Sequence, residues 1–87
     1  MTELQVVKRN GRTTAYDRER IENAVKHAFR SIKKEISENE FEQLIDGIEE
    51  EITSRFTEFY PNVENIQDIV EKHLMHAEYY EVAKKYI

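Results

Sequence analysis

The sequence predicts an α+β fold, in which a small bundle of about four helices is capped by an N-terminal β-hairpin or small sheet. Two short β-prone runs lie near the N-terminus, and apolar residues recur at helical spacing through the rest of the chain. Capping and helix-breaking residues separate these periodic stretches. The length of 87 residues suits a single domain, 1–87, because the chain contains no linker, repeat or low-complexity segment.

The hairpin is predicted from residues 4–8 and 13–16, which are rich in β-prone side chains. The connection 9–12 contains Asn10 followed by Gly11, a pair that suits a type I′ turn. An isolated hairpin has an apolar face that needs covering, so this one should lie across the helices.

The first helix is predicted to begin after Asp17, which can cap it, and to run to about Lys34. Its apolar residues recur at helical spacing and are Ile21, Ala24, Val25, Ala28, Phe29 and Ile32.

The second helix is predicted to begin after Ser37, which forms a capping-box pattern with Glu40. Its apolar stripe should be the centre of the core and consists of Phe41, Leu44, Ile45, Ile48, Ile52 and Phe56. Gly47 interrupts this helix at a cost of about 1 kcal/mol relative to Ala, which suggests a close helix crossing that excludes a side chain.

Pro61 ends that segment, and Asn62 can cap a third helix. Its inward residues are predicted to be Ile66, Ile69, Val70 and Leu74. The pattern loses phase around Ala77 and Glu78, after which a fourth short helix is expected from Tyr79, Tyr80, Val82, Ala83 and Tyr86. The tyrosines in this segment suit a packing seam or a partner surface.

The composition excludes several classes of protein. The absence of cysteine removes disulfides, thiol nucleophiles and thiolate zinc sites. No apolar run approaches the ~20 residues that cross a bilayer, and the N-terminus is unlike a signal peptide, so we expect a cytoplasmic protein without membrane contact. A net charge of -5 disfavours direct nucleic-acid binding.

The charge is unevenly distributed along the chain. Residues 1–36 contain nine basic and five acidic side chains, a balance of +4, whereas residues 37–87 contain four and thirteen, a balance of -9. The basic side chains nearest the N-terminus are Lys8, Arg9, Arg12, Arg18 and Arg20. They could meet a compact polyanion such as a triphosphate, or those on the hairpin could form a solvated tip.

With only two glycines, the chain has neither a Walker A loop nor a dinucleotide fingerprint. A phosphate site would therefore rely on basic side chains and on the positive end of the helix that follows Asp17. We predict no catalytic residues, because no Ser, His and acid grouping is present. We also predict no metal site, because His73 and His76 lack a Glu-x-x-His pattern and cysteine partners.

Four short motifs in order carry a resemblance to a known family. They comprise residues 6–12 (VVKRNGR), 16–21 (YDRERI), 66–71 (IQDIVE) and 79–87 (YYEVAKKYI). Over residues 4–87 the chain resembles the ATP-cone, the regulatory nucleotide-binding domain of ribonucleotide reductases. The resemblance favours a ligand-binding hairpin over a solvated tip.

The resemblance implies that ATP or dATP binds between the sheet and the helices as an allosteric effector. By position, Lys8 and Arg9 would meet the phosphates, and Mg²⁺ would bind through these phosphates. Three residues, Val7, Tyr16 and Ile21, would form the nucleoside pocket. Asp17 and Arg20 would make polar contacts nearby, and Ile66 and Gln67 would line the sugar side.

The implied function is control of ribonucleotide reductase activity, and so of deoxyribonucleotide synthesis, through nucleotide-dependent oligomerisation. The partners would be catalytic or radical-generating reductase subunits. The chain departs from many relatives at Arg20, where they have Lys, and at Gln67, where some have His or Asp, so the preference between ATP and dATP stays open. Relatives usually continue beyond the equivalent of Ile87, as expected if this chain is an excised fragment.

Three alternatives use the same features differently. A helical protein-interaction module without a small ligand would use the tyrosines and acidic helices. The family module also occurs in a transcriptional repressor of reductase genes, but its zinc ribbon needs cysteines. An enzyme of another type is the third alternative.

Overall fold

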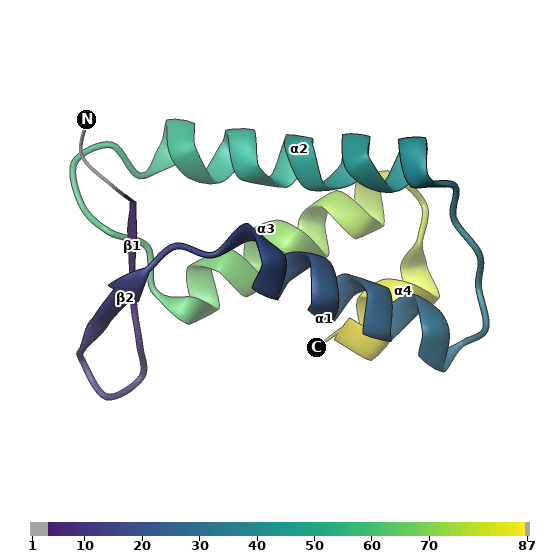
Figure 1. Ribbon diagram of the computed structural model, residues 1–87, viewed down its shortest axis with the longest axis horizontal. Helices are drawn as coiled ribbons and strands as arrows, with labels where there is room; N and C mark the ends of the chain where they lie inside the picture. Colours follow the sequence, from purple (N-terminus) through teal and green to yellow (C-terminus); the bar gives the residue numbers. More distant parts are fainter. Residues whose placement is uncertain (1–3, 87) are drawn as a thin grey trace.

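A computed structural model describes residues 4–86 and confirms the α+β prediction. The hairpin strands are β1 (Gln5–Val7) and β2 (Thr13–Ala15), and the helices are α1 (Arg18–Ser31), α2 (Glu38–Arg55), α3 (Val63–His76) and α4 (Tyr80–Tyr86). The hairpin caps one end of the helices (Figure 1). Residues 1–3 and Ile87, which ends the family resemblance, lie outside the described residues.

The strands pair antiparallel, with Val6 opposite Thr14. The predicted type I′ turn is wrong, because Asn10 does not have the positive φ that this turn needs. Instead, the Gly11 amide donates to the Lys8 carbonyl at 2.9 Å and Gly11 has φ +85°, which is a type I turn followed by a left-handed glycine. The Asn10 side chain accepts from the Arg12 amide at 3.0 Å, which favours this three-residue loop.

The hairpin is attached to the start of α3 through its first strand. The Val7 amide donates to the Pro61 carbonyl at 2.9 Å, and Val7 forms a parallel bridge with Asn62. Asn62 also caps α3 in a complete capping box with Asn65. The helix cap and the hairpin anchor therefore coincide.

Asp17 caps α1 as predicted, with its Oδ1 accepting from the Glu19 amide at 3.0 Å. The helix ends at Ser31, three residues before the predicted end at Lys34. Lys33 has φ 55°, and the Lys34 amide donates back to the Phe29 carbonyl at 3.0 Å. This Schellman-type end stops the helix without a glycine.

The predicted capping box of α2 is only half formed. Ser37 Oγ accepts from the Glu40 amide at 3.2 Å. The Glu40 carboxylate instead accepts from the Tyr79 hydroxyl at 3.2 Å. A contact with the segment before α4 thus replaces the local bond that the pattern predicts.

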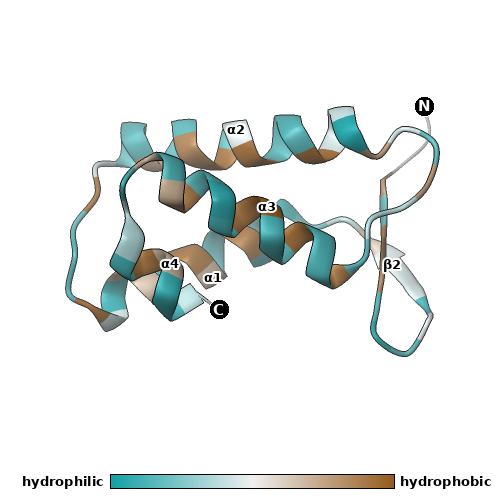
Figure 2. Cartoon of the chain, turned by 180° about the vertical axis from the view of Figure 1, so that it is seen from behind, coloured by the Kyte–Doolittle hydropathy of each residue, from teal (hydrophilic) through white to brown (hydrophobic). Residues whose placement is uncertain are grey.

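The core lies between the helices, where α1 packs on α4, α2 on α3, and α3 on α4. The apolar side of α2 faces α3 (Figure 2). The predicted inward residues of α3 are all buried, but Ala24 of α1 is exposed and Leu44 of α2 is only half-buried. The buried apolar residues are Val6, Ile21, Val25, Ala28, Phe29, Phe41, Ile45, Ile48, Ile52, Phe56, Ile66, Ile69, Val70, Leu74, Val82 and Ala83.

Gly47 does face another helix, but no side chain is excluded there. A Cβ built on Gly47 would lie 3.5 Å from the His73 ring, which is ordinary van der Waals distance. The prediction of a crossing too close for a methyl group is therefore wrong. Among residues 4–86, no helix is long and apolar enough to cross a membrane.

Candidate functional site

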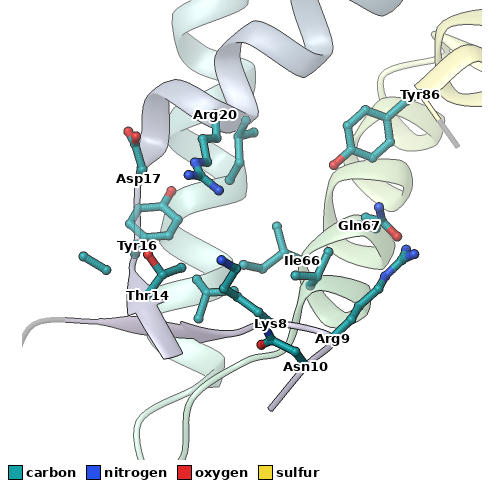
Figure 3. Close-up of a pocket in the computed structure, with 14 residues that line it drawn as sticks. Lys8, Arg9, Asn10, Thr14, Tyr16, Asp17, Arg20, Ile66, Gln67 and Tyr86 are labelled. Atoms are coloured by element: carbon teal, nitrogen blue, oxygen red, sulfur yellow. The ribbon is translucent and has the colours of Figure 1, made fainter. Parts of the chain in front are cut away.

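A cleft of about 500 Å³ opens between the hairpin, the start of α1, the start of α3 and the end of α4 (Figure 3). This volume lies within the range of small-ligand sites, about 300–1,000 Å³. The residues that line the cleft are Val6, Lys8, Arg9, Asn10, Thr14, Ala15, Tyr16, Asp17, Arg20, Ile21, Val63, Ile66, Gln67 and Tyr86.

The structure brings together eight of the nine predicted site residues, and Val7 is the one that lies outside this lining. Side chains alternate along a strand, so Val6 and Lys8 share the face toward the cleft while Val7 belongs to the opposite face. The cleft lining therefore includes Val6 and not Val7, and a role of Val7 in nucleotide binding stays a prediction. Alternation counted from Lys8 would have found Val6 in the sequence.

The other unpredicted lining residues are Asn10, Thr14, Ala15, Val63 and Tyr86. Thr14 follows from the register, since it lies opposite Val6 across the hairpin. Tyr86 has no local signal, because the packing of α4 on α1 and α3 brings it to the cleft.

Three cations reach the cleft from two elements. Lys8 and Arg20 extend into its centre, and Arg9 lies on the side of Gln67 (Figure 3). Among residues 4–86, no carboxylate lies within ion-pair distance of these three side chains. Their charges are therefore available to an anionic ligand.

The two remaining basic candidates do not join them. Arg12 is exposed on the hairpin loop, outside the cleft lining. Arg18 points to α2, where its guanidinium lies 2.8 Å from Asp46 Oδ1 and 3.4 Å from Glu49 Oε1. These carboxylates, Asp46 first, raise the pKa of Arg18 above its ordinary value.

The inner wall of the cleft is apolar. Val6, Ile21 and Ile66 are less than a tenth exposed, and the ring of Tyr16 lines the cleft with them from the hairpin side. An apolar wall beside several cations suits a ligand with a flat apolar part and a polyanionic part. Asp17 also borders the cleft, but one of its oxygens is engaged in capping α1.

The Tyr16 hydroxyl donates to Glu49 Oε2 at 2.9 Å. Burial and this hydrogen bond raise the pKa of Tyr16, so the phenol stays protonated at neutral pH. The hydrogen bond joins the cleft to α2, which contributes no lining residue of its own.

The tyrosines of the last segment occupy three different environments. Tyr79 packs edge-on against Phe29, with ring centroids 5.2 Å apart, so it belongs to the packing seam. Tyr86 is half-buried at the cleft. Tyr80, 51% exposed, is the one of the three whose ring is mainly in solvent.

No group of three or more potential metal ligands occurs among residues 4–86. His73 has a structural partner instead, because its Nε2 lies 2.9 Å from Glu51 Oε1. Glu51 also contacts Lys72 and Arg55; these contacts, Lys72 first, lower the pKa of its carboxyl.

The fold and the cleft define a small α+β domain with a ligand-sized site, in which three cations lie beside an apolar wall. The sequence profile of the ATP cone domain matches residues 4–87, so the chain belongs to the ATP-cone family. It is 36% identical, over 90 aligned positions, to the ribonucleoside-diphosphate reductase subunit alpha of Chlamydia pneumoniae. The alignment covers 97% of this chain but 9% of that protein, so the chain spans about a tenth of its relative.

Proposed function

We propose that this domain binds ATP and dATP in the cleft and thereby controls the overall activity of a ribonucleotide reductase. The observation that supports this most directly is the convergence of Lys8, Arg9 and Arg20 beside an apolar pocket large enough for a nucleoside. The similarity to a reductase alpha subunit supports the choice of enzyme.

The triphosphate would lie against Lys8 and Arg9, since charge-assisted hydrogen bonds to phosphate are among the strongest that side chains make. Arg20 extends toward the same region from α1 and would add a third cation. Magnesium would bind through the phosphates and keep most of its waters, because few carboxylates border the cleft.

The nucleoside would occupy the apolar part, between Tyr16 on one side and Ile66 on the other, where Ile21 also lines the cleft. Gln67 follows Ile66 on α3 and would lie on the sugar side, where the presence or absence of a 2′-hydroxyl differs between ATP and dATP. Val6, which lines the cleft, would take the place in this pocket that the family resemblance implies for Val7.

Control of activity requires that ATP and dATP favour different association states of the longer protein that contains this domain. A ligand shifts an equilibrium only through its different affinities for the two states. We propose that the sugar side transmits this difference through α3 and α4 to neighbouring subunits in the cytoplasm. Tyr80 is the tyrosine on this surface available to a partner, since Tyr79 and Tyr86 are engaged within the domain.

Calorimetric titration of the chain with ATP, dATP and GTP tests the proposal. We expect ATP and dATP to bind with one stoichiometry and to compete for one cleft. If neither nucleotide gives heat at millimolar concentration, a protein-interaction module without a small ligand becomes the better explanation. We expect no ATP hydrolysis, because no group of residues that could hold a metal ion for phosphoryl transfer occurs among residues 4–86. Steady phosphate release that survives repurification would contradict a purely regulatory role.

A further inference from the structure

One wall of the cleft is held in place by a residue outside it. Tyr16 is the residue before the α1 cap, and its hydroxyl donates to Glu49 Oε2 across 33 positions of sequence. Glu49 lies on α2 and does not line the cleft. A ring that lines the cleft is thus hydrogen-bonded to a helix that contributes no lining residue.

The Glu49 carboxylate is itself held from a second side. Its Oε1 accepts from Arg18 Nη1 at 3.4 Å, and the same guanidinium bonds Glu22 at 3.3 Å and Asp46 at 2.8 Å. Both carboxylate oxygens of Glu49 therefore accept hydrogen bonds, one from Tyr16 and the other from Arg18. These side chains join the start of α1 to α2 by polar contacts, while α1 as a whole lies mainly against α4.

We propose that Glu49 is a positioning residue for the nucleotide cleft: it fixes the ring of Tyr16 in its binding orientation and so raises nucleotide affinity without contacting nucleotide. The inference rests on the proposed function. Without its acceptor, the half-buried phenol would be free to adopt other rotamers, and the nucleotide would have to order it on binding. Ordering one side chain costs about 0.5–1.5 kcal/mol, which corresponds to a loss of affinity of about two- to twelvefold.

The same link makes α2 responsive to occupancy. Binding linkage is reciprocal, so if Glu49 stabilises the bound cleft, nucleotide must stabilise the contact of Tyr16 with Glu49. The amide hydrogens in the middle of α2 should therefore exchange more slowly with solvent when nucleotide is bound, although no α2 side chain lines the cleft.

The test is a double-mutant cycle in ATP affinity, measured by calorimetry on the unsubstituted chain, Glu49→Ala, Tyr16→Phe and the double variant. We expect Glu49→Ala to weaken ATP binding about two- to twelvefold when Tyr16 is present and to have no further effect in the Tyr16→Phe background. Glu49→Gln retains a neutral acceptor and should recover part of the affinity. Asp46→Asn removes the shortest ion pair of Arg18 and leaves the Tyr16 hydrogen bond in place. This variant should bind ATP with the affinity of the unsubstituted chain.

Circular dichroism spectra establish that each variant is folded before it is titrated. Equal weakening by Glu49→Ala in both backgrounds would show a general structural effect and overturn the inference, as would unchanged affinity. In both cases ATP still binds, so the proposed function survives. Absence of ATP binding to the unsubstituted chain would overturn the proposed function, and this inference with it.

Discussion

The Val7 amide donates a hydrogen bond to the Pro61 carbonyl at 2.9 Å, and this bond attaches the hairpin to the residue before the α3 cap. Because strand side chains alternate, fixing Val7 against α3 turns Val6 and Lys8 toward the cleft. The hairpin and α3 therefore border the ligand site next to the point where they are joined.

Replacing Lys8 and Arg9 together with Ala should abolish binding of both ATP and dATP while the fold remains intact. Both side chains are exposed and unpaired with carboxylates among residues 4–86, so their loss removes phosphate contacts and little packing. Calorimetry measures the binding, and thermal unfolding without ligand checks the fold. The matched control is Arg12→Ala, on the same hairpin but outside the cleft. Parent-like affinity in the double variant would mean that the phosphates bind elsewhere.

Changing Gln67 to Ala should alter the response to dATP more than the binding of ATP. Gln67 is exposed at the cleft beside buried Ile66, where the sugar is proposed to lie. Light scattering of the longer protein that contains this domain, with each nucleotide, would report its association state. Calorimetric titration of the domain would report its affinity for ATP and for dATP. An identical change in the affinity and response for ATP and dATP would argue against a role in sugar discrimination.

Magnesium should strengthen ATP binding through the phosphates, with few direct protein ligands. Because a ligand selective for the folded state stabilises it by RT ln(1 + [L]/Kd), ATP at a hundred times its Kd should add about 2.7 kcal/mol to the free energy of unfolding. The melting temperature should therefore rise with ATP and rise less when a chelator is present. Equal shifts with and without chelator would show that magnesium is not part of the site.

Gly47→Ala should stabilise the domain by up to about 1 kcal/mol, since Ala is the better helix former and its methyl group would meet His73 at an ordinary distance. Chemical denaturation of the two proteins would measure the difference. Gly11→Ala is the informative counterpart. Gly11 has open space around it but φ +85°, so the same substitution there should destabilise the fold. A loss of stability in Gly47→Ala would show that α2 and α3 approach more closely than the structure has them.

Stability should fall at alkaline pH, partly through Tyr16. An unfolded tyrosine ionises near pH 10, whereas burial and then Glu49 raise the pKa of Tyr16 in the folded state. The contribution is therefore complete below about pH 10 and is lost as the pH rises toward the folded pKa. The difference in stability between the parent and Tyr16→Phe should shrink from pH 9 to pH 11. A constant difference would mean that the phenol is not held by Glu49.

The segments with strong local signals were correctly predicted from sequence. Asp17, Ser37 and Asn62 cap the three long helices because each carries a side-chain oxygen that accepts from an unpaired amide in the first turn. The stripes of α2 and α3 are inward because apolar burial follows helical period. Local misses have local reasons too: Asn10-Gly11 suits more than one turn, and Lys33 takes a left-handed conformation usually given to glycine.

The candidate site also combines features that local patterns predicted with features that they could not predict. Local patterns were enough to predict the helices, the hairpin and the group of basic residues near the N-terminus, because capping, periodicity and charge act between near neighbours in the chain. The packing of whole elements brings Lys8, Arg9 and Arg20 to one cleft and Tyr86 to its lining. It also pairs Arg18 with Asp46 and hydrogen-bonds Tyr16 to Glu49. These contacts join residues far apart in sequence, and they depend on how whole elements pack, which no local pattern encodes.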